Sequence, residues 1–487
     1  MKTINEFATD RINRPIKAVQ FGEGNFLRAF VDYMIDILNE TTDFNGSIVL
    51  VKPIEFGTLE QFEKQDCLYT VYLRGLENGV ETIKKRIVTS VSGTAAAHED
   101  YENYAKLATV ESLRFIISNT TEAGIVLNLN DKLEMTPPSS YPAKLAKFLY
   151  ERYKHFNGDA SKGLIILPVE LIDNNGKELE RCVKALAEAW NLESGFIKWL
   201  DEACVFTSTL VDRIVTGYPR DEDKKIFEEL GYEDKLLVTG EPFALWVIES
   251  KRDISGELPF EKAGLPVIFT DDHKPYKQRK VRILNGAHTS FVLASYLAGN
   301  DFVGQSMDDE TVFRFMRSTI FDEVIPTLDL PEKELTDFAE AVIERFKNPF
   351  IKHSLLAISL NSVSKWKARC MPSFTEYINR KGTLAEHLTF SLAALIAFYS
   401  GTEIRDGALI GHRGSEEYLI KDDKFVLEFF AANSSLAPDE LADKVLGNKD
   451  FWGIDLREYN GAAEKVSAYI KDIRNLGMRK TLEKYFA

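Results

Sequence analysis

Three side chains within residues 280–290 have the types and the spacing that proton transfer requires. In the sequence KVRILNGAHTS, Lys280, Asn285 and His288 stand five and then three residues apart. A helical turn of about 100° per residue places the three polar groups within an arc of roughly 140°, so they are expected to face the same space. A lysine that can lose its proton, an amide that can bind an oxygen and an imidazole that can orient either one are the parts needed to move a proton on and off a carbinol oxygen.

The sequence around Lys280 is strongly basic. Lys277, Arg279 and Arg282 surround it. Like charges disfavour an ammonium, so we expect the pKa of Lys280 to be lowered. The alternative is a basic junction between a strand and a helix, in which His288 is a structural group with satisfied hydrogen bonds.

The elements that would position such a site begin near the N-terminus with a strand, a glycine turn and a helix. The apolar strand 16–21 runs into Gly22-Glu23-Gly24, and a helix follows. Gly22 would allow a tight turn, and Gly24 would let the backbone approach a pyrophosphate at the positive end of the helix. Leu27 stands where the usual GxGxxG pattern has its third glycine, so a simple turn is the alternative. The residues predicted to bind a dinucleotide here are Phe21, Gly22, Gly24, Asn25 and Phe26.

A second apolar strand, residues 47–51, is followed by Lys52 and Pro53. Dinucleotide-binding folds commonly place an Asp or Glu here, which holds the ribose 2′-hydroxyl. The choice of cofactor is therefore weakly specified. Glu55 is near enough to replace that acid, whereas Lys52 would tolerate a 2′-phosphate.

Two further strands, 114–118 and 163–169, are separated by helical segments. This alternation predicts a parallel, doubly wound sheet, whose ligands bind in the loops at the carboxyl ends of its strands. The loop after the first strand contains Thr121 and Glu122, which we predict to contact the cofactor. The loop after the second opens with Glu170, which we predict to contact the substrate. A solvated turn is the alternative for both loops.

From about residue 280 onward the strand pattern gives way to periodic helical stretches. We therefore predict an α/β fold with a doubly wound N-terminal domain, residues 1–275, and a mainly α-helical C-terminal domain, residues 276–487. The polar loop 270–277 is the expected boundary between them.

Composition limits the classes of function. The 487 residues suffice for two domains and carry a net charge of −15, which argues against nucleic acid or an anionic membrane as a partner. The four cysteines have neither CxxC nor metal-type spacing, which fits a reducing compartment. The N-terminus has no apolar targeting segment and no run is long enough to span a bilayer, so we expect a cytoplasmic protein. The sequence leaves the oligomeric state open.

The order of these motifs resembles the mannitol dehydrogenase family of long-chain polyol and sugar-acid dehydrogenases, over nearly the full length. The shared features are the glycine turn with Phe26 and Arg28, the segment VDRI at 211–214, EPFALWVIE at 241–249, and the Lys-x4-Asn-x2-His spacing of Lys280, Asn285 and His288. The resemblance implies a Rossmann-type N-terminal domain, a helical C-terminal domain, an NAD(H) cofactor and no catalytic metal.

The resemblance also assigns roles to single residues. It implies that Lys280 is the general acid/base, with Asn285 and His288 beside it on the substrate oxygen, and that Asp212 contacts the substrate. One departure concerns an asparagine with which mannitol dehydrogenases hold the reacting oxygen, because this chain has Leu171 at that position. A changed class of substrate is the simplest explanation.

Several segments, such as PVELIDNNG and LNGAHT, are most similar to sugar-acid members of the family. The expected reaction is the reversible reduction of D-tagaturonate to D-altronate in galacturonate catabolism, with fructuronate or a mannitol-type polyol as the alternative substrate. Lys365 and Arg369, with Lys367 between them, would bind the substrate carboxylate, and His412 and Arg413 are weaker candidates. A solvated basic face is the alternative for this segment, and a noncatalytic nucleotide-binding sensor is the alternative for the whole chain.

Overall fold

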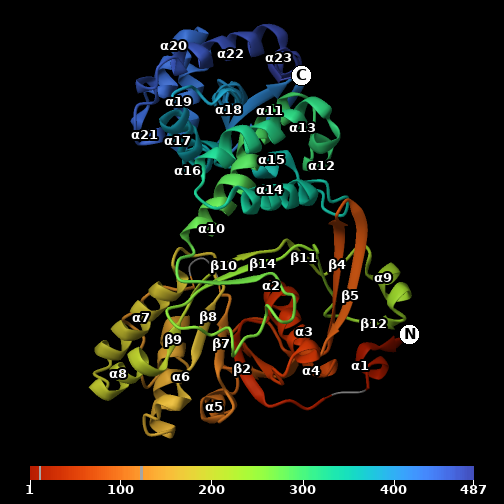
Figure 1. The fold of residues 1–487 in the computed structure, drawn as a ribbon, viewed down its shortest axis with the longest axis vertical. Coiled ribbons are helices and arrows are strands. Elements are labelled where there is room, and N and C mark those ends of the chain that lie inside the picture. Colours follow the sequence, from red (N-terminus) through yellow and green to blue (C-terminus); the bar gives the residue numbers. More distant parts are fainter. Residues whose placement is uncertain (10–11, 121–123, 487) are drawn as a thin grey trace. The chain divides into compact units, whose positions relative to one another are not determined.

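The computed structural model describes residues 1–9, 12–120 and 124–486. The chain divides into two compact units, Met1–His273 and Lys274–Ala487 (Figure 1). None of the helices in the described ranges combines the length and the hydropathy that a bilayer span requires.

The first unit is built on a six-stranded parallel sheet. Its strands are β2 (Ile16–Phe21), β3 (Ser47–Lys52), β6 (Val91–Ala96), β7 (Phe115–Ser118), β8 (Ile165–Pro168) and β9 (Val205–Phe206). They lie in the order β6-β3-β2-β7-β8-β9, and every neighbouring pair is parallel. Numbered along the chain this is the order 3-2-1-4-5-6 of the Rossmann fold. The ligand crevice of that fold lies where the order reverses, which here is between β2 and β7.

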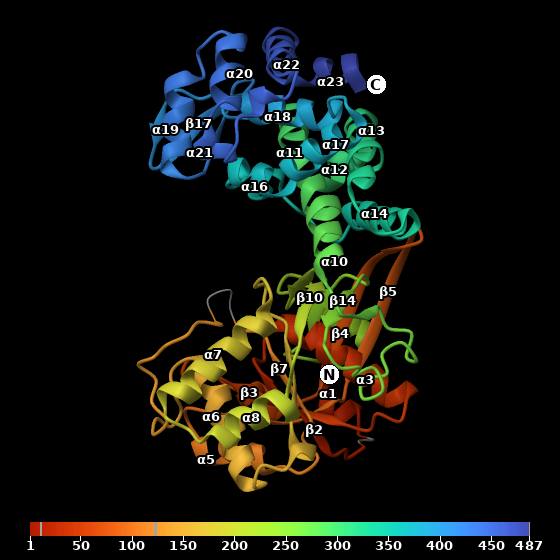
Figure 2. The same ribbon diagram turned by 60° about the vertical axis from the view of Figure 1, so that its left-hand side comes forward.

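Both faces of this sheet are covered, as a parallel sheet requires. Successive side chains of a strand point to opposite faces, so Val19 and Ile116 pack into one layer, whereas Ala18 and Ile117 pack into the other. The first layer is formed by α6 (Tyr141–His155), α7 (Asn175–Ala189) and α8 (Ser194–Ala203) (Figures 1 and 2).

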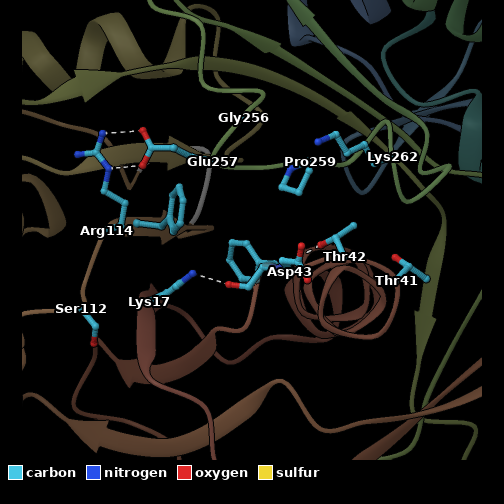
Figure 3. Close-up of a pocket in the computed structure, with 12 residues that line it drawn as sticks. Lys17, Thr41, Thr42, Asp43, Ser112, Arg114, Gly256, Glu257, Pro259 and Lys262 are labelled. Atoms are coloured by element: carbon cyan, nitrogen blue, oxygen red, sulfur yellow. Dashed lines mark hydrogen bonds and ion pairs between the residues drawn. The ribbon is translucent and has the colours of Figure 1, made fainter.

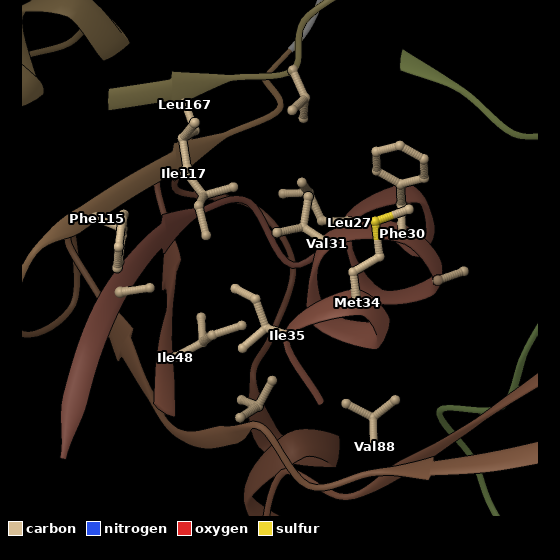
Figure 4. Packing of buried hydrophobic residues seen from close by; sticks show 14 of the residues in the cluster. Leu27, Phe30, Val31, Met34, Ile35, Ile48, Val88, Phe115, Ile117 and Leu167 are labelled. Carbon is tan, nitrogen blue, oxygen red and sulfur yellow. The ribbon is translucent and has the colours of Figure 1, made fainter. Parts of the chain in front are cut away.

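The helix that follows the glycine turn packs in the second layer. It begins as α2 (Asn25–Leu27), widens into a π-helical turn (Arg28–Asp32) and continues as α3 (Tyr33–Thr41). Its apolar residues, among them Val31 and Ile35, form one buried cluster with Ile48 and Ile117 of the sheet (Figure 4). This packing fixes the direction of the helix, and therefore the position of its N-terminus at the carboxyl end of β2.

The described part of the first unit also contains sheets of three, four and two strands. The three-stranded sheet consists of β10 (Ser208–Asp212), β14 (Leu245–Glu249) and β15 (Val267–Thr270). The four-stranded sheet consists of β11 (Val215–Gly217), β13 (Val238–Gly240) and the hairpin of β4 (Tyr69–Glu77) and β5 (Val80–Val88). The shorter elements are β1 (Lys2–Thr3), paired with β12 (Tyr232–Glu233), and the helices α1 (Ile4–Phe7), α4 (Glu60–Lys64), α5 (Tyr101–Lys106) and α9 (Asp223–Leu230).

The second unit is mainly helical, as predicted. Its helices are α10 (Lys274–Arg279), α11 (Gly286–Leu297), α12 (Val303–Asp308), α13 (Glu310–Ser318), α14 (Glu332–Phe346), α15 (Leu355–Ile358), α16 (Ser362–Arg369), α17 (Met371–Lys381), α18 (Glu386–Phe398), α19 (Lys424–Asn433), α20 (Pro438–Leu446), α21 (Lys449–Trp452), α22 (Ala462–Leu476) and α23 (Met478–Phe486). α11 and α18 are apolar and buried nearly all round, so they form the centre of the unit. The unit also contains a small antiparallel sheet, formed by β16 (Ile404–Arg405), β17 (Ala408–Arg413) and β18 (Glu416–Ile420).

Candidate active site

The helix that carries the Lys280 motif contains a π-helical segment, Lys280–Asn285, between α10 and α11. The N–H of Gly286 donates to the carbonyl oxygen of Val281, five residues back. In an α-helix a step of five residues rotates a side chain by roughly 140°, whereas an i→i+5 turn stacks residues that are five apart. Lys280 and Asn285 therefore share one side of the helix more closely than the α-helical prediction allowed.

The basic residues next to Lys280 in the sequence are held by partners on other helices. The Arg279 guanidinium lies 4.5 Å from the ring centre of Phe338 on α14, and Arg282 donates to Ser373 Oγ on α17 (3.3 Å). Burial lowers the pKa of both guanidiniums. The predicted lowering of the Lys280 pKa assumed that its neighbours in the sequence also surround it in space. Because Arg279 and Arg282 have partners on other helices, adjacency in the sequence does not measure the charge around Lys280.

His288 lies in the first turn of α11, in an aromatic setting. Its ring stacks on Phe346 with 4.2 Å between centroids, and His353 meets it edge-on at 5.2 Å. The Nε2 atom is fully shielded and finds no hydrogen-bond partner among the described residues. Burial, followed by the nearby charges of His353, Arg345, Arg369 and Lys365, holds the pKa of His288 well below its usual range. The imidazole is therefore neutral at physiological pH, and its orphaned nitrogen is suited to hold an oxygen in place.

Two of the three cations predicted to bind a carboxylate share one face of α16. Lys365 and Arg369 stand four residues apart, and the charges of both act on His288. Lys365 Nζ donates to the carbonyl oxygen of Ile358 (2.8 Å), and Arg369 Nη1 donates to Thr289 Oγ1 (3.4 Å). In the part of the chain that the structure describes, neither side chain has a carboxylate within ion-pair distance. Both therefore lack an ion-pair partner among the described residues, and the charge of Asp422 acts on Lys365 only from beyond ion-pair distance.

Lys367 lies on the other side of α16, because a helix turns by about 200° over two residues. Its Nζ lies 3.5 Å from the point where a Cβ on Gly453 would stand, at the end of α21. The predicted trio is therefore a pair, Lys365 and Arg369, with Lys367 facing a different element.

The structure adds two residues that sequence reasoning missed. Arg345, on the buried face of α14, and His353 both act electrostatically on His288. The sequence offers one weak signal for Arg345, a basic residue at the helical spacing of the apolar Phe338 and Val342 of α14, and none for His353. We call Arg345, Lys365 and Arg369, together with His288 and His353, the basic cluster.

The weaker candidates for carboxylate binding, His412 and Arg413, lie beside acidic residues of the protein. Arg413 pairs with Asp301 (2.8 Å) and with Glu416 (3.2 Å), and His412 is mostly exposed, 3.9 Å from Glu417. These contacts compensate the charge of Arg413, so it is not available to a ligand in the way that Arg369 is.

The glycine turn of the first unit has the geometry of a dinucleotide site. Gly22 has φ of +116°, and a Cβ on it would lie 3.0 Å from the carbonyl oxygen of Asn119, at the end of β7. The turn therefore reaches the strand-order reversal between β2 and β7. Gly24 precedes the helix, and the space where its Cβ would stand is open, with no atom of the described residues within 4 Å. The first N–H groups of a helix lack intrahelical partners, so this end of the helix can receive a phosphate.

The other residues of the turn that were predicted to bind the cofactor differ in which of their atoms a ligand could contact. The Phe21 side chain is fully buried against Tyr104 and Tyr141, so only its backbone can face a ligand. Phe26 stacks on Phe30 (5.0 Å between centroids). Asn25 Oδ1 accepts a hydrogen bond from Arg28 (2.6 Å), which also donates through Nε to the carbonyl oxygen of Glu23 (3.2 Å). Arg28 thus fixes the shape of the turn.

The structure describes only some of the residues that were predicted to bind ligands in the loops after β7 and β8. Thr121 and Glu122 lie outside the described residues. Glu170 is buried, and its carboxylate accepts hydrogen bonds from Ser118 Oγ (3.2 Å) and from the N–H and Oγ1 of Thr120 (3.0 and 3.1 Å). Burial raises the pKa of Glu170. As placed, Glu170 fastens the ends of β7 and β8 together.

Asp212 and Leu171 stand at further strand ends. Asp212 ends β10 and is buried. Leu171 follows β8 and is 65% exposed. A leucine side chain offers no hydrogen bond, so Leu171 cannot hold the reacting oxygen as the asparagine of mannitol dehydrogenases is expected to do at this position.

A pocket of about 510 Å³ lies at the opposite edge of the sheet, where β2 and β7 begin (Figure 3). Arg114 and Glu257, which line it, pair through two bonds of 2.6 and 2.8 Å, and Lys17 donates to the carbonyl oxygen of Phe44. These charged groups thus have partners within the protein, and doubly wound sheets bind ligands at the carboxyl ends of their strands. We assign no ligand to this pocket.

Two sequence families match the chain. Residues 16–262 match the mannitol dehydrogenase Rossmann domain, and residues 272–474 match the mannitol dehydrogenase C-terminal domain. The chain belongs to the mannitol dehydrogenase family. It is therefore an oxidoreductase, and both the family and the fold class predicted from the sequence are confirmed.

Relatives match this family member over its whole length. It is 46% identical over 489 residues to the altronate oxidoreductase of Escherichia coli O139:H28, covering 99% of both chains, and 44% identical over 492 residues to that of Yersinia pestis bv. Antiqua, covering 100% of both. Among solved structures, the complex of Pseudomonas fluorescens mannitol 2-dehydrogenase with NAD and D-mannitol aligns at 22% identity with a TM-score of 0.67, over 97% of this chain and 94% of that one. Substrate-free D-sorbitol dehydrogenase aligns at 22% identity with a TM-score of 0.80, over 99% and 100%. At this identity the structural likeness shows the fold alone.

Proposed function

We propose that this member of the mannitol dehydrogenase family catalyses the reversible, NAD(H)-dependent reduction of D-tagaturonate to D-altronate. The observation that carries the proposal is the basic cluster, in which Lys365 and Arg369 lack acidic partners among the described residues. A half-buried cation without a partner costs free energy, so such a pair is expected to be kept for an anionic ligand. The full-length relatives at 46% and 44% identity, both altronate oxidoreductases, point to a sugar acid as that ligand.

The chemistry of Lys365 and Arg369 suits the carboxylate of a six-carbon keto acid. The planar guanidinium of Arg369 can donate two parallel hydrogen bonds to a carboxylate, and the ammonium of Lys365 can donate another. A charged hydrogen bond is worth about 1.5–3 kcal/mol, or roughly ten- to a hundredfold in binding. A neutral ketose lacks this group, so it would leave both cations unpaired.

The Lys280 motif would handle the proton. NADH, when bound, supplies the hydride to the carbonyl carbon of the substrate. Lys280 gives its proton to the carbonyl oxygen as negative charge develops there, and the amide of Asn285 donates a hydrogen bond to the same oxygen. His288, neutral and with its Nε2 unpartnered in the described structure, holds that oxygen or the lysine in place. In the direction of oxidation, neutral Lys280 accepts the alcohol proton.

The first unit would hold the dinucleotide through the glycine turn. Gly22 keeps the turn tight, and Gly24 leaves room for the pyrophosphate at the start of the helix. Arg28 holds Glu23 and Asn25, so the turn is formed before the cofactor arrives.

The proposal is tested with purified protein, NADH and one ketose at a time: D-tagaturonate, D-fructuronate or D-fructose. The loss of reduced nicotinamide is followed by its absorbance, and the product is identified by NMR. We expect tagaturonate to be reduced with the highest kcat/KM, with one altronate formed for each NADH oxidised. Faster reduction of fructuronate would mean that fructuronate, not tagaturonate, is the substrate. Faster reduction of fructose would make the chain a polyol dehydrogenase. No oxidation of NADH with any of the three ketoses would refute the proposal.

A further inference from the structure

The strand that should end in an acidic residue ends in Lys52 instead. Rossmann folds hold the ribose 2′-hydroxyl of NAD with an Asp or Glu about 20 residues after the glycine turn. β3 closes with Lys52, and the Lys52 side chain is almost fully buried, at 2% exposure. It is close enough to Glu23 of the glycine turn for its charge to act on that carboxyl group. Lys52 therefore stands where the adenosine ribose would be recognised.

The ammonium of Lys52 has no donor left for a ligand. A lysine has three N–H donors. One goes to the carboxylate of Glu99, one to the carbonyl oxygen of Gly57 (3.1 Å) and one to that of Glu55 (3.4 Å). These contacts argue against the sequence-based expectation that Lys52 would tolerate a 2′-phosphate, because the three donors that would bind it already have partners.

The partner carboxylate comes from the neighbouring strand. Glu99 follows β6, which pairs with β3, and the N–H of Ala97 donates to the carbonyl oxygen of Lys52 (3.3 Å). His98 adds a hydrogen bond to the carbonyl oxygen of Pro53 (3.2 Å). The loops after β3 and β6 are thus tied together. Glu99 remains 51% exposed while one of its oxygens is held by Lys52, so its carboxylate is both oriented and open to solvent.

Three carboxylates, those of Glu23, Glu55 and Glu99, lie around the buried ammonium of Lys52. The charge of Arg28 also acts on Glu23, and Glu55 acts on Lys144. A ribose hydroxyl can donate a hydrogen bond to a carboxylate, whereas a phosphate dianion would be repelled by it. The corner therefore favours the ligand without the 2′-phosphate.

Lys52 also holds the loop that follows β3. It does so through its bonds to Glu55 and Gly57, and Phe56 between them is 79% exposed. Replacing Lys52 would disturb this loop as well as the charge. Glu99, whose side chain is held by Lys52 while the rest of it faces solvent, is the cleaner position to change.

We propose that Glu99, oriented by the buried Lys52, is the specificity-determining residue that makes this chain select NAD(H) over NADP(H). The proposal rests on the proposed function only in that the chain binds a nicotinamide dinucleotide. It assigns to Glu99, on the neighbouring strand, the part that the acid at the end of the second strand plays in other Rossmann folds.

The test measures the dissociation constants of NADH and NADPH by fluorescence titration, which needs no turnover, for the wild type and three variants. Glu99→Gln should lower the ratio of the NADPH constant to the NADH constant by at least about tenfold, because one repulsive charge is removed and a donor of Lys52 is freed. Glu99→Asp, which keeps the charge, should retain most of the preference. Glu102→Gln removes the same charge from α5, three residues away, and should leave the ratio unchanged.

An unchanged ratio in a folded Glu99→Gln variant would overturn the proposal, as would a wild type that binds both cofactors equally. These failures differ from failure of the proposed function, in which the wild type would bind neither dinucleotide. Thermal unfolding of each variant shows whether it is folded, and if Glu99→Gln is not, Glu99→Ala, which also removes the carboxylate, replaces it in the same comparison.

Discussion

The carbonyl oxygen of Arg369 lies 3.2 Å from the point where a Cβ on Gly286 would stand. α16 therefore ends against the first turn of α11 because residue 286 has no side chain to hold it away. The same contact is continued by Cys370, whose Sγ lies 3.5 Å from the carbonyl oxygen of Gly286. The glycine within the Lys280 motif thus brings the Arg369 guanidinium to Thr289 and His288, and couples the proton-transfer residues to the residues proposed to bind a carboxylate.

Lys280→Met should cut turnover by at least about a hundredfold, the low end of what a positioned acid/base contributes. Binding of NADH should be nearly unchanged, because the dinucleotide is assigned to residues of the first unit. Stopped-flow turnover and NADH titration check the two parts separately. Lys277→Met, which removes a cation three residues earlier, is the control and should keep most of the activity. Wild-type turnover of Lys280→Met across the pH range would make the lysine structural.

Gly24→Val should weaken NADH binding by about tenfold or more, because a branched side chain would hold the pyrophosphate off the helix N-terminus. A Cβ at this position meets no atom within 4 Å in the part of the chain that the structure describes, so the variant should fold with a normal melting temperature. The KM for the sugar acid should change less than the KM for NADH. If a folded variant binds NADH as tightly as the wild type does, the dinucleotide site lies elsewhere.

Asp32→Asn should stabilise the protein at pH 8 by about 1–3 kcal/mol. Asp32 is fully buried under the glycine turn, and burial raises its pKa to about 7, although Tyr69 and Gln20 donate hydrogen bonds to it. Between about pH 4 and 7 the folded state keeps a proton that the unfolded state has lost, so this residue makes stability fall as the pH rises through that window. An amide in place of the carboxyl group does not titrate, so the substitution should remove this dependence.

Urea unfolding of wild type and Asp32→Asn at pH 5 and pH 8 measures this effect. The two curves should lie closer together at pH 5 than at pH 8. Asp36→Asn is the matched control of opposite sign, because Asp36 is paired with Arg86 (2.5 Å) and accepts the N–H of Thr89 (2.7 Å), so its loss should destabilise the protein. A larger gain from Asp32→Asn at pH 5 than at pH 8 would contradict a raised pKa.

The sequence was most informative where one local pattern carries both structure and chemistry. β2 spans residues 16–21, as the apolar run predicted, and Gly22 after it has the positive φ that a tight turn requires. Buried parallel strands are continuous apolar runs, so they can be found without knowledge of their partners. The hairpin of β4 and β5 gave no such signal, because β5 carries charged residues along its exposed face.

The basic cluster shows what the sequence leaves out. Lys365, Lys367 and Arg369 alternate along the chain, but only residues four apart share a helical face, so Lys367 leaves the group. Arg345 and His353 reach His288 through the packing of helices, which no pattern near them reveals. The i→i+5 turn at Lys280 likewise depends on hydrogen bonds that the amino-acid types alone do not distinguish from those of an α-helix.

The most direct test of carboxylate recognition compares kcat/KM for D-tagaturonate and for fructose in the wild type, in Arg369→Met and in Lys367→Met. Arg369→Met should lower the value for tagaturonate by roughly ten- to a hundredfold and leave the slow rate on fructose nearly unchanged, because only the sugar acid has a carboxylate to lose. Lys367→Met removes the same charge from the opposite side of α16 and should change neither value. A wild type that reduces fructose as well as tagaturonate, or an Arg369→Met variant that loses both activities equally, would contradict the account.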